Sequence, residues 1–412
     1  MSGLDRPRLR ALEAFPVEQD GERLIALRDP GGFTDRIALL PRPLLDLVSL
    51  FDGDHSIGEI FAILRGRHGD EAPDPADIAR VIESFDEAGL LDSPAFDLRK
   101  RRIEEDWLAL PTRPAAHAGG AYAAAADPLR RQVDAHFSHP DGPGPAGASA
   151  AASAALPLAG LLAPHIDFHR GGPTYAWAYR ALLERSDADL FVLLGTCHAG
   201  MEDPFAATLK AFETPLGPAA VDRDVFDALL RRSGSDLLAS EAAHRGEHSI
   251  EFQAVMLKAV LGRRSFTILP VLASFLHEAV WRGSGPEEDP RVPRFLEALG
   301  ETIAASGRRV CVIGGVDLAH VGPRFGDPRP NTAETLARVA REDAAMLEAV
   351  TAGDAAAFFE SVAADGDSRR ICGLSPIYAF LRALPGARGQ LLRYSQWPDP
   401  QGAVTFCAAA FS

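Results

Sequence analysis

The sequence predicts a large α/β domain over residues 112–412, with αβα layers around a mostly parallel sheet, and a small α+β module of winged-helix type over residues 1–100. Two observations carry this prediction. From about residue 157 onward, apolar runs bounded by turn residues alternate with longer helical patterns, which is typical of parallel strands whose connecting helices cover both sheet faces. Before residue 100, short strand and helix signals form a separate pattern, and residues 101–111 are assigned to a charged linker.

The N-terminal module shows strand signals followed by helix signals. Residues 21–30 and 35–41 each have the pattern of a short strand, with a turn around Gly31 between them. Three helical patterns follow, and in the second one Ser56 and Glu59 have the spacing of a capping box. The helices are expected over residues 41–51, from Ser56 onward, and over residues 75–88, with Gly89 at the end.

The large domain shows four apolar runs that read as buried strands, alternating with five helical patterns. The strands are expected within residues 158–165, 189–198, 265–274 and 308–320. The helices are expected over residues 174–185, 222–233, 249–261, 291–306 and 332–351. Residues 140–157 are rich in Pro, Gly, Ala and Ser and lack the large apolar side chains that order a segment, so we expect a mobile loop there.

Composition and charge limit the classes of function. The chain of 412 residues is 47% hydrophobic and 24% charged, a balance typical of globular proteins, and its formal net charge is -15. An acidic chain repels nucleic-acid phosphates and anionic lipid surfaces, so we expect neither nucleic acid nor a membrane as a partner. The one basic run, from Arg99 to Arg102, is interpreted as a solvated linker helix.

The cysteines and the first residues of the chain indicate the cellular compartment in which the protein is expected. The four cysteines stand far apart and none forms a CxxC pair, as expected of a chain in a reducing environment. The first residues lack the apolar core of a signal peptide, and no stretch reaches the ~18 apolar residues of a spanning helix. We therefore expect a cytoplasmic protein.

Residues able to bind metals or transfer protons recur at corresponding positions of the large domain. Each lies at the end of an expected strand or, for Cys372, just before a helix expected to begin near Ser375 or Pro376. Ligands of open α/β sheets gather at the carboxyl ends of the strands. These residues are His165, Cys197, His198, Asp317, His320 and Cys372. Each has a simpler reading, with the histidines as loop residues, the cysteines as small buried side chains and Asp317 as a helix cap. Their recurrence at matching positions predicts one shared site.

Eight motifs follow one another through the large domain. They are RPAAHAGGAY, LLAPHIDFHRGG, LLGTCHAG, FETPLGPAAVD, GEHSIEFQ, ILPVLAS, GGVDLAHVG and ICGLSPI. In this order they resemble the motifs of the Memo family, which includes protein B of the AmmeMemoRadiSam system. The resemblance implies the fold of the class III extradiol dioxygenases of the LigB type.

The Memo resemblance also implies a cleft in which two histidines and a cysteine bind a metal ion, here His165, His198 and Cys372. Asp317 and His320 would line the same pocket, His320 as a general acid/base and Asp317 as an acceptor that orients a ligand histidine. Two imidazoles and a thiolate form a soft site, which suits Fe(II), Cu or Zn and disfavours Mg or Ca. We expect Fe(II) first, with Cu and Zn as alternatives.

Three positions depart from the family motifs. His169 stands where a tyrosine or small polar residue is usual, Cys197 adds a thiol beside a candidate ligand, and Ser375 replaces a frequent histidine. We assign His169 and Cys197 to a substrate pocket, with Glu247 and His248 at its rim. The simpler reading of Glu247 and His248 is that they fix the start of the helix that follows.

Two N-terminal segments, FDGDHSIGEIFAIL and DIARVIESFDEAGLLDS, resemble PqqD, a small peptide-binding domain of peptide-modifying pathways. This resemblance implies a peptide or protein partner for the module. The alternative is a module that only packs against the larger domain.

Two functions follow from these observations. The first is a non-haem, metal-dependent and dioxygenase-like oxidoreductase that acts on a small molecule or peptide. The second is a non-catalytic metal- or peptide-binding scaffold in a modification pathway, whose N-terminal module docks a peptide or partner enzyme. A fold does not by itself imply a function, so both stay open.

Overall fold

The structure is a computed structural model that describes residues 4–19, 21–145 and 157–412. The chain divides into two compact units, Met1–Leu110 with Pro323–Gly326, and Pro111–Gly322 with Asp327–Ser412. Each unit is described by itself below. Most of the loop predicted over residues 140–157 lies outside the described residues.

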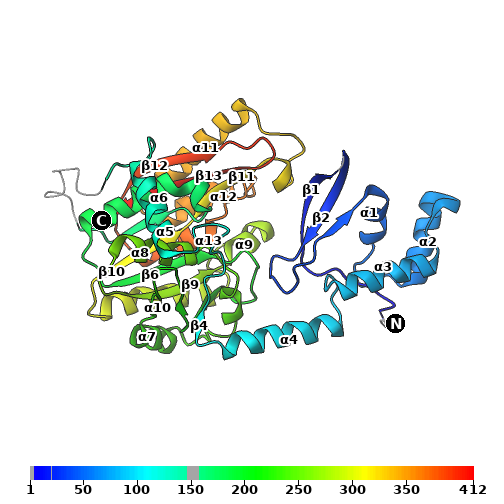
Figure 1. The fold of residues 1–412 in the computed structure, drawn as a ribbon, viewed down its shortest axis with the longest axis horizontal. Coiled ribbons are helices and arrows are strands. Elements are labelled where there is room, and N and C mark those ends of the chain that lie inside the picture. Colours follow the sequence, from blue (N-terminus) through cyan, green and yellow to red (C-terminus); the bar gives the residue numbers. More distant parts are fainter. Residues whose placement is uncertain (1–3, 20, 146–156) are drawn as a thin grey trace. The chain divides into compact units, whose positions relative to one another are not determined.

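The N-terminal unit contains an antiparallel sheet of order β1-β2-β3 and four α-helices (Figure 1). The strands are β1 (Glu13–Gln19), β2 (Glu22–Arg28) and β3 (Ala38–Leu40). The helices are α1 (Arg42–Val48), α2 (Ile57–His68), α3 (Pro75–Glu87) and α4 (Pro94–Ala109). Apolar residues of β2, β3, α1, α2 and α3 meet in one core that includes Leu27, Leu47, Ile60, Leu64, Ile78 and Ile82.

Local sequence signals explain most of this unit. The capping box that begins α2 is confirmed, because Ser56 and Glu59 each accept a hydrogen bond from the backbone N–H of the other. Strand β1 was not predicted, because Pro16 interrupts the pattern of a strand. Proline is tolerated there because β1 is an edge strand of this sheet. Much of the segment assigned to a linker, residues 101–111, lies in α4, where Trp107 is buried.

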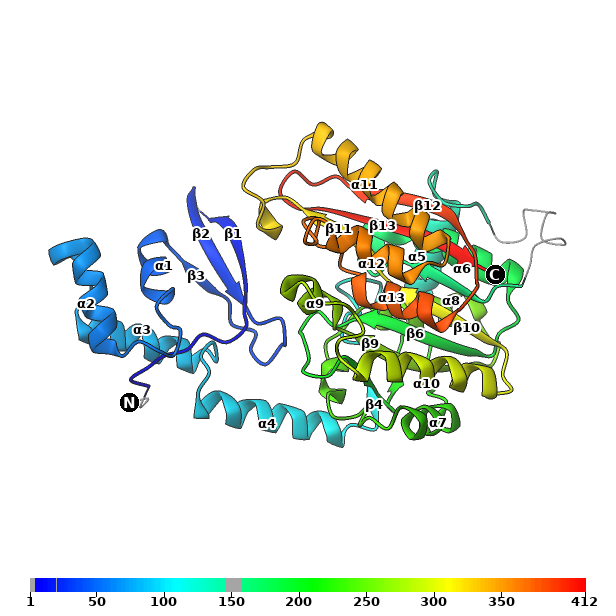
Figure 2. The same cartoon turned by 180° about the vertical axis from the view of Figure 1, so that it is seen from behind.

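The large unit is built on an eight-stranded sheet of order β11-β13-β5-β10-β6-β9-β7, with β12 paired to β13 (Figures 1 and 2). Its strands are β5 (Gly160–Ala163), β6 (Leu190–Thr196), β7 (Phe205–Ala207), β9 (Thr267–Ala273), β10 (Val310–Gly315), β11 (Asp317–Val321), β12 (Gly389–Trp397) and β13 (Ala403–Phe411). The central strands β5, β10, β6 and β9 are parallel, as predicted. Antiparallel strands extend both edges, and β4 (Thr112–Arg113) pairs separately with β8 (Ala211–Phe212).

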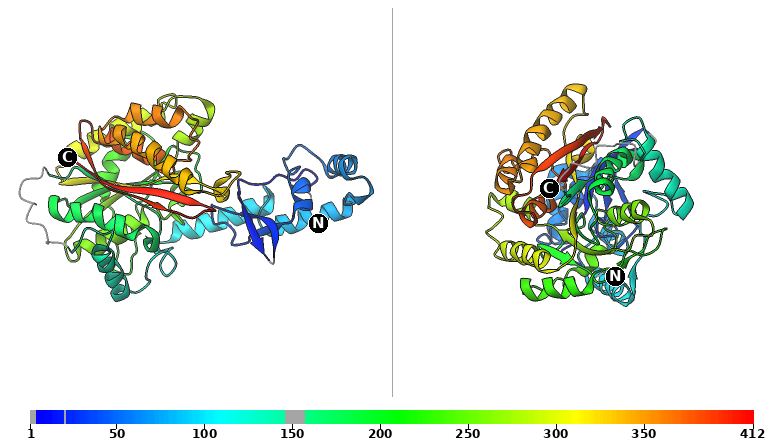
Figure 3. Two further views of the ribbon diagram at one scale, coloured as in Figure 1. Left: turned by 90° about the horizontal axis from the view of Figure 1, so that it is seen from above. Right: turned by 90° about the vertical axis from the view of Figure 1, so that its left-hand side faces the viewer.

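Helices cover both faces of this sheet, as the views in Figures 1 to 3 show. One core contains residues of α7 (Arg223–Ser233), α10 (Arg291–Ala305), α11 (Ala333–Thr351), α12 (Ala355–Ala363) and α13 (Leu374–Ala383), and α9 (Leu276–Arg282) adds Leu276. The other contains residues of α5 (Ala126–Ser138), α6 (Phe168–Arg185) and α8 (Glu251–Leu261). Strand β6 contributes side chains to both cores, because alternate side chains of a strand point to opposite faces of the sheet. The predicted αβα layering is therefore confirmed.

Two glycines let a loop approach the carboxyl ends of the central strands. A Cβ atom on Gly195 would lie 2.4 Å from Ser249 Oγ, and one on Gly315 would lie 2.4 Å from Ser249 O. These distances are shorter than any normal contact, so the segment before α8 can lie against β6 and β10 only because both residues are glycine. That segment also carries Glu247 and His248.

No helix in the described ranges is both long and apolar enough to cross a membrane.

Candidate metal centre

His165 follows β5 and is fixed by two neighbours from the β10–β11 turn. Its backbone N–H donates to Asp317 Oδ1 at 3.0 Å, and its ring Nδ1 lies 2.9 Å from Gly315 O. A carbonyl oxygen only accepts, so Nδ1 carries a proton and donates it there. The other ring nitrogen, Nε2, is left as the ligand atom, and it lies 3.1 Å from Sγ of Cys372.

His198 follows β6 and is fixed in the same way by a carboxylate. Both carboxylate oxygens of Glu247 lie 3.0 Å from its ring Nδ1, and one of them accepts its backbone N–H at 2.8 Å. The ring therefore donates from Nδ1 and turns Nε2 toward Cys372, 3.2 Å from Sγ. Hydrogen bonds of this kind set the tautomer and orientation of metal-binding histidines.

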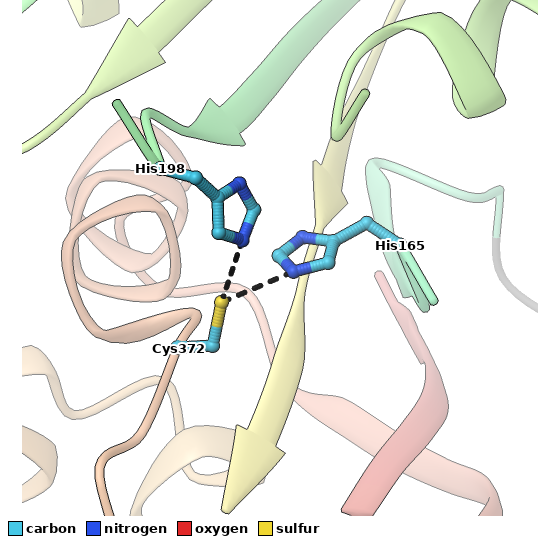
Figure 4. Close-up of side chains that lie close together, drawn as sticks. All are labelled: His165, His198 and Cys372. Atoms are coloured by element: carbon cyan, nitrogen blue, oxygen red, sulfur yellow. Dashed lines mark hydrogen bonds between the residues drawn. The ribbon is translucent and has the colours of Figure 1, made fainter. Parts of the chain in front are cut away.

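Cys372 reaches the two histidines from the loop between α12 and α13. Its backbone N–H donates to Leu318 O at 3.0 Å, and that of Gly373 donates to Asp317 O at 2.8 Å. Figure 4 shows both imidazoles pointing at the thiol. The ligand atoms of His165, His198 and Cys372 all lie within 4.8 Å of one another, so the three residues predicted as ligands come together.

The distances fit a metal ion. Metal–sulfur and metal–nitrogen bonds are about 2.3 and 2.0–2.1 Å long, so bond angles between about 90° and 110° place nitrogen and sulfur about 3.1–3.5 Å apart. The separations of 3.1 and 3.2 Å from the two Nε2 atoms to Sγ fall at the short end of that range. Both separations are therefore compatible with a single ion that the three side chains would bind together.

The charges of the three side chains favour the ligand form of the thiol. Burial would raise the pKa of Cys372, but the imidazoles of His165 and His198 outweigh it and hold the pKa well below its usual value. Burial would lower the pKa of His165, but Cys372 and Asp317 raise it to about 9. The thiolate is the form that binds metals, and a bound ion would replace the proton that the raised pKa keeps on Nε2 of His165.

A second group of possible metal ligands, His198, Glu247 and His248, adjoins the first. Glu247 accepts the backbone N–H groups of His198 and Ser249 in addition to the His198 ring, which uses most of its acceptor capacity. We therefore interpret it as a support for His198. His248 stacks on the His198 ring at a centroid distance of 4.5 Å and meets the His165 ring edge-on at 5.3 Å, so its imidazole forms a wall of the site.

Comparison with known proteins shows the family to which the chain belongs. The family model of Memo-like proteins matches residues 113–405, which is more than half of the chain. The chain belongs to the Memo family. A MEMO1 family protein of Methanopyrus kandleri is 30% identical over 297 residues, which cover 70% of this chain and 94% of that protein. A MEMO1 family protein of Aquifex aeolicus is 27% identical over 405 residues, 96% of each chain, so that match extends through the N-terminal unit.

The Memo domain begins at a buried ion pair that was not predicted from the sequence. The guanidinium of Arg113 contacts the carboxylate of Glu251, and both side chains are fully buried. Arg113 also donates to the backbone oxygens of His244 and Glu247, so it holds the segment that leads to the metal-site wall. A single arginine before a Gly-rich turn matches no functional motif. Its contact with Glu251 is therefore visible only in the folded structure.

The two remaining polar residues of the predicted pocket lie on β11. Asp317 is buried beside His165, with Oδ2 3.6 Å from Nε2, and burial raises its pKa. It holds the His165 backbone, whereas Gly315 O and Glu247 are the acceptors for the ligand rings. His320 has ring Nδ1 3.2 Å from Leu318 O, so this nitrogen faces the backbone of its own strand.

The other two pocket candidates, His169 and Cys197, contact neighbours outside the group of His165, His198 and Cys372. The side chain of His169 is 65% exposed, and its Nδ1 lies 2.7 Å from Asp167 in the first turn of α6. Cys197 is buried in the core shared with α6 and α8, and burial raises its pKa to about 12. Its Sγ lies 3.5 Å from Gly200 O, which fits the simpler reading of a core thiol.

Proposed function

We propose that the Memo domain binds a redox-active metal ion through His165, His198 and Cys372 and acts as an oxidoreductase. The observation that carries the proposal is the approach of two imidazole Nε2 atoms to one thiol at 3.1 and 3.2 Å, with both Nδ1 atoms already hydrogen-bonded to acceptors. Such an arrangement is expected of ligands and has no obvious role in packing.

Fe(II) is the first candidate for this ion, with Cu and Zn as alternatives. Two imidazoles and a thiolate disfavour hard ions such as Mg²⁺ by ligand type, and three protein ligands would leave coordination positions open for substrate or oxygen. A bound iron or copper ion would supply one-electron chemistry. The chain's own residues position the substrate, a small molecule or peptide, against the wall that His248 forms beside both ligand rings.

The test is elemental analysis of untagged protein purified anaerobically without chelators, followed by titration with Fe(II), Cu and Zn. Wild-type protein is expected to bind one ion with a sulfur-to-metal absorption band, and loading with Fe(II) should support oxygen uptake with a suitable substrate. His198→Ala and Cys372→Ser should lose the ion, whereas the matched variants His68→Ala and Cys407→Ala should keep it. Retention of stoichiometric metal by Cys372→Ser would refute the ligand assignment.

A second proposal concerns the N-terminal unit, for which we infer a peptide or protein partner. Strand β3 is an edge of its sheet, and its residue Leu39 and the preceding Ile37 are 42% and 53% exposed. Edge strands with apolar side chains pair readily with added strands. If the unit docks a partner, full-length protein should capture it and the Leu39→Lys variant should not. If the whole protein turns over substrate while wild type and Leu39→Lys capture the partner equally well, the result would favour an enzyme whose N-terminal unit does not dock a partner through β3.

The expected location and the excluded partners stay predictions. The net charge of -15 supports the expectation that neither nucleic acid nor an anionic membrane is bound. Cell fractionation and a vesicle sedimentation assay test these two points, and a cytoplasmic fraction is the expected result.

A further inference from the structure

The loop that delivers Cys372 contains an uncommon backbone conformation. In the described ranges, the residues other than glycine with positive φ are Asp367, at 55°, and Arg370, at 53°. Both lie within five residues of the ligand cysteine. The left-handed region is unfavourable for residues with a side chain, so other contacts must hold these two residues there.

Side chains of the loop supply the first of these contacts. Asp367 Oδ1 accepts the backbone N–H of Ile371 at 2.8 Å, which closes the turn. Arg370 Nε donates to His320 O at 3.0 Å, and its Nη2 donates to Asp327 at 2.5 Å. The left-handed residue Arg370 is therefore fixed on both sides, by the backbone of β11 and by a carboxylate.

A buried ion pair supplies the second contact. The guanidinium of Arg369 meets the carboxylate of Asp343 on α11, and their side chains are 6% and 0% exposed. Asp343 also accepts hydrogen bonds from Thr405 Oγ1 at 2.6 Å and from the Tyr394 hydroxyl at 2.9 Å. A buried carboxylate with three donors is a rigid anchor, because leaving any of these groups unpaired is costly.

The backbone of the loop then follows β11 toward the metal site. His320 N–H donates to Arg369 O at 2.8 Å, and the N–H groups of Cys372 and Gly373 donate to Leu318 O and Asp317 O. The register of β11 against β13 shifts between Asp317 and His320, so this stretch departs from a regular ladder where the loop attaches. Strand β11 thereby connects the anchored residue Arg369 to the thiol three residues later.

We infer that Asp343, Arg369 and Arg370 are positioning residues for Cys372. They hold the loop in a left-handed conformation that sets Sγ between the two imidazoles, and they act through the backbone without contact with the ion. Backbone conformations of this kind persist where surrounding contacts over-determine them, and they gather at functional sites. The inference rests on the metal-binding function proposed above and extends it to the loop that orders the third ligand.

A matched pair of substitutions isolates the backbone contribution. Arg370→Asn and Arg370→Val both remove the contacts to Asp327 and His320, but asparagine tolerates the left-handed region and valine does not. With Co²⁺ as the probe, the Val variant should bind about tenfold more weakly than the Asn variant, with a weaker sulfur-to-cobalt absorption band. Equal affinity and equal bands in the two variants would overturn the role of the left-handed turn.

A second pair isolates the ion pair. The double variant Asp343→Asn/Arg369→Met removes both charges together, so neither is left buried alone. Its control, Asp222→Asn/Arg308→Met, removes the ion pair between Asp222 and Arg308. Arg308 also contacts Asp189, which directly precedes β6, so this pair lies at the end of the strand away from the metal site. At temperatures where both variants are folded by circular dichroism, the first should lose at least tenfold in Co²⁺ affinity and the control should match wild type. Wild-type affinity in the first variant would contradict the inference.

A metal-free measurement separates this inference from the proposed function. If wild-type protein binds none of Co²⁺, Fe(II), Cu and Zn, the proposed function fails, but the positioning role is still measurable. In crystal structures of the two Arg370 variants without metal, Sγ should stay about 3.1–3.2 Å from both Nε2 atoms with asparagine and move away with valine. An unmoved sulfur in the valine variant would exclude a positioning role, whatever the site binds.

Discussion

Glu247 holds His198 at two points, with one carboxylate oxygen accepting the backbone N–H at 2.8 Å and both oxygens lying 3.0 Å from ring Nδ1. One buried side chain thereby fixes both the position of the residue and the direction of its imidazole. Burial would raise the pKa of Glu247, but the neighbouring His198 and His248 hold it well below its usual value, so it stays a carboxylate.

Loss of this acceptor should weaken metal binding without removing a ligand. Removal of partners that orient metal-binding histidines typically lowers affinity 10- to 100-fold. We expect Glu247→Ala to fall in that range and Glu247→Gln, which keeps an accepting oxygen, to lose less. Isothermal titration with Zn²⁺ measures both. If the Ala and Gln variants bind as tightly as wild type, Glu247 is only a packing residue.

Replacement of the thiolate by a carboxylate should change which metal is preferred. Cys372→Asp turns a soft ligand into a hard one, so affinity for Cu(I) should fall by more than affinity for Fe(II). Competition titrations under anaerobic conditions measure the two affinities, and Cys372→Ser is the control that lacks a charged ligand. An unchanged ratio of copper to iron affinity in the Asp variant would contradict sulfur ligation.

His244 should make the fold sensitive to acid. Burial lowers its pKa to about 3, and its Nε2 lies 3.1 Å from Ala206 O. In the unfolded chain His244 binds a proton near pH 6.5, whereas in the folded chain it stays neutral until much lower pH. The contribution of neutral His244 to the unfolding free energy is therefore fully present above pH 6.5 and is lost as pH falls toward 3. Between pH 6.5 and 5 the loss is about 2 kcal/mol. Urea unfolding at both pH values measures the change in unfolding free energy between pH 6.5 and 5. This change should be smaller for His244→Gln than for wild type, and an identical change would disprove the role of His244.

The buried pair of Arg113 and Glu251 should be far more sensitive to loss of one partner than of both. Arg113→Met leaves the Glu251 carboxylate buried without its guanidinium, at a cost of about 3–5 kcal/mol in unfolding free energy. The double variant Arg113→Met/Glu251→Gln should recover a large part of that loss. Denaturant unfolding of the three proteins measures the effect, and a double variant no more stable than Arg113→Met would show that the charge of Glu251 is not the cause.

Two glycine substitutions should have opposite effects. In Gly315→Ala the new methyl group would lie 2.4 Å from Ser249 O, so β10 or the segment before α8 must move, and unfolding free energy and metal affinity should both fall. Gly300 lies in α10 with open space around it, so Gly300→Ala should raise unfolding free energy by about 0.5–1 kcal/mol. Thermal unfolding of both proteins measures the contrast.

The convergence of the three candidate ligand residues was predictable because each ends or precedes an element with a strong local signal. Strands β5 and β6 are continuous apolar runs, and the register of β10 against both brings their carboxyl ends together. The motif resemblance then selected His165, His198 and Cys372 among the polar residues at those ends. The choice needed no knowledge of side-chain orientation.

The supports of the ligands could not be predicted in this way. Glu247 meets His198, which lies 49 residues earlier, only because Gly195 and Gly315 admit Ser249 close to the strands. The antiparallel strand β13 was missed because its sequence, AVTFCAAAF, is rich in alanine, which has a low strand propensity, although every residue of it is buried. Its place in the sheet depends on pairing with β5 and β11, which is tertiary information.

The separation of the ligands along the chain sets the order of events during synthesis. His165 and Cys372 are 207 residues apart, and β13, which pairs with the strand ahead of His165, begins only at Ala403. A nascent chain that has exposed both imidazoles still holds the thiol inside the ribosome or has not yet translated it. Any ion that the site takes up must therefore be delivered to a nearly finished polypeptide. A metal ion that meets the two histidines earlier in translation cannot be selected for its preference for sulfur, because the thiol is not yet available.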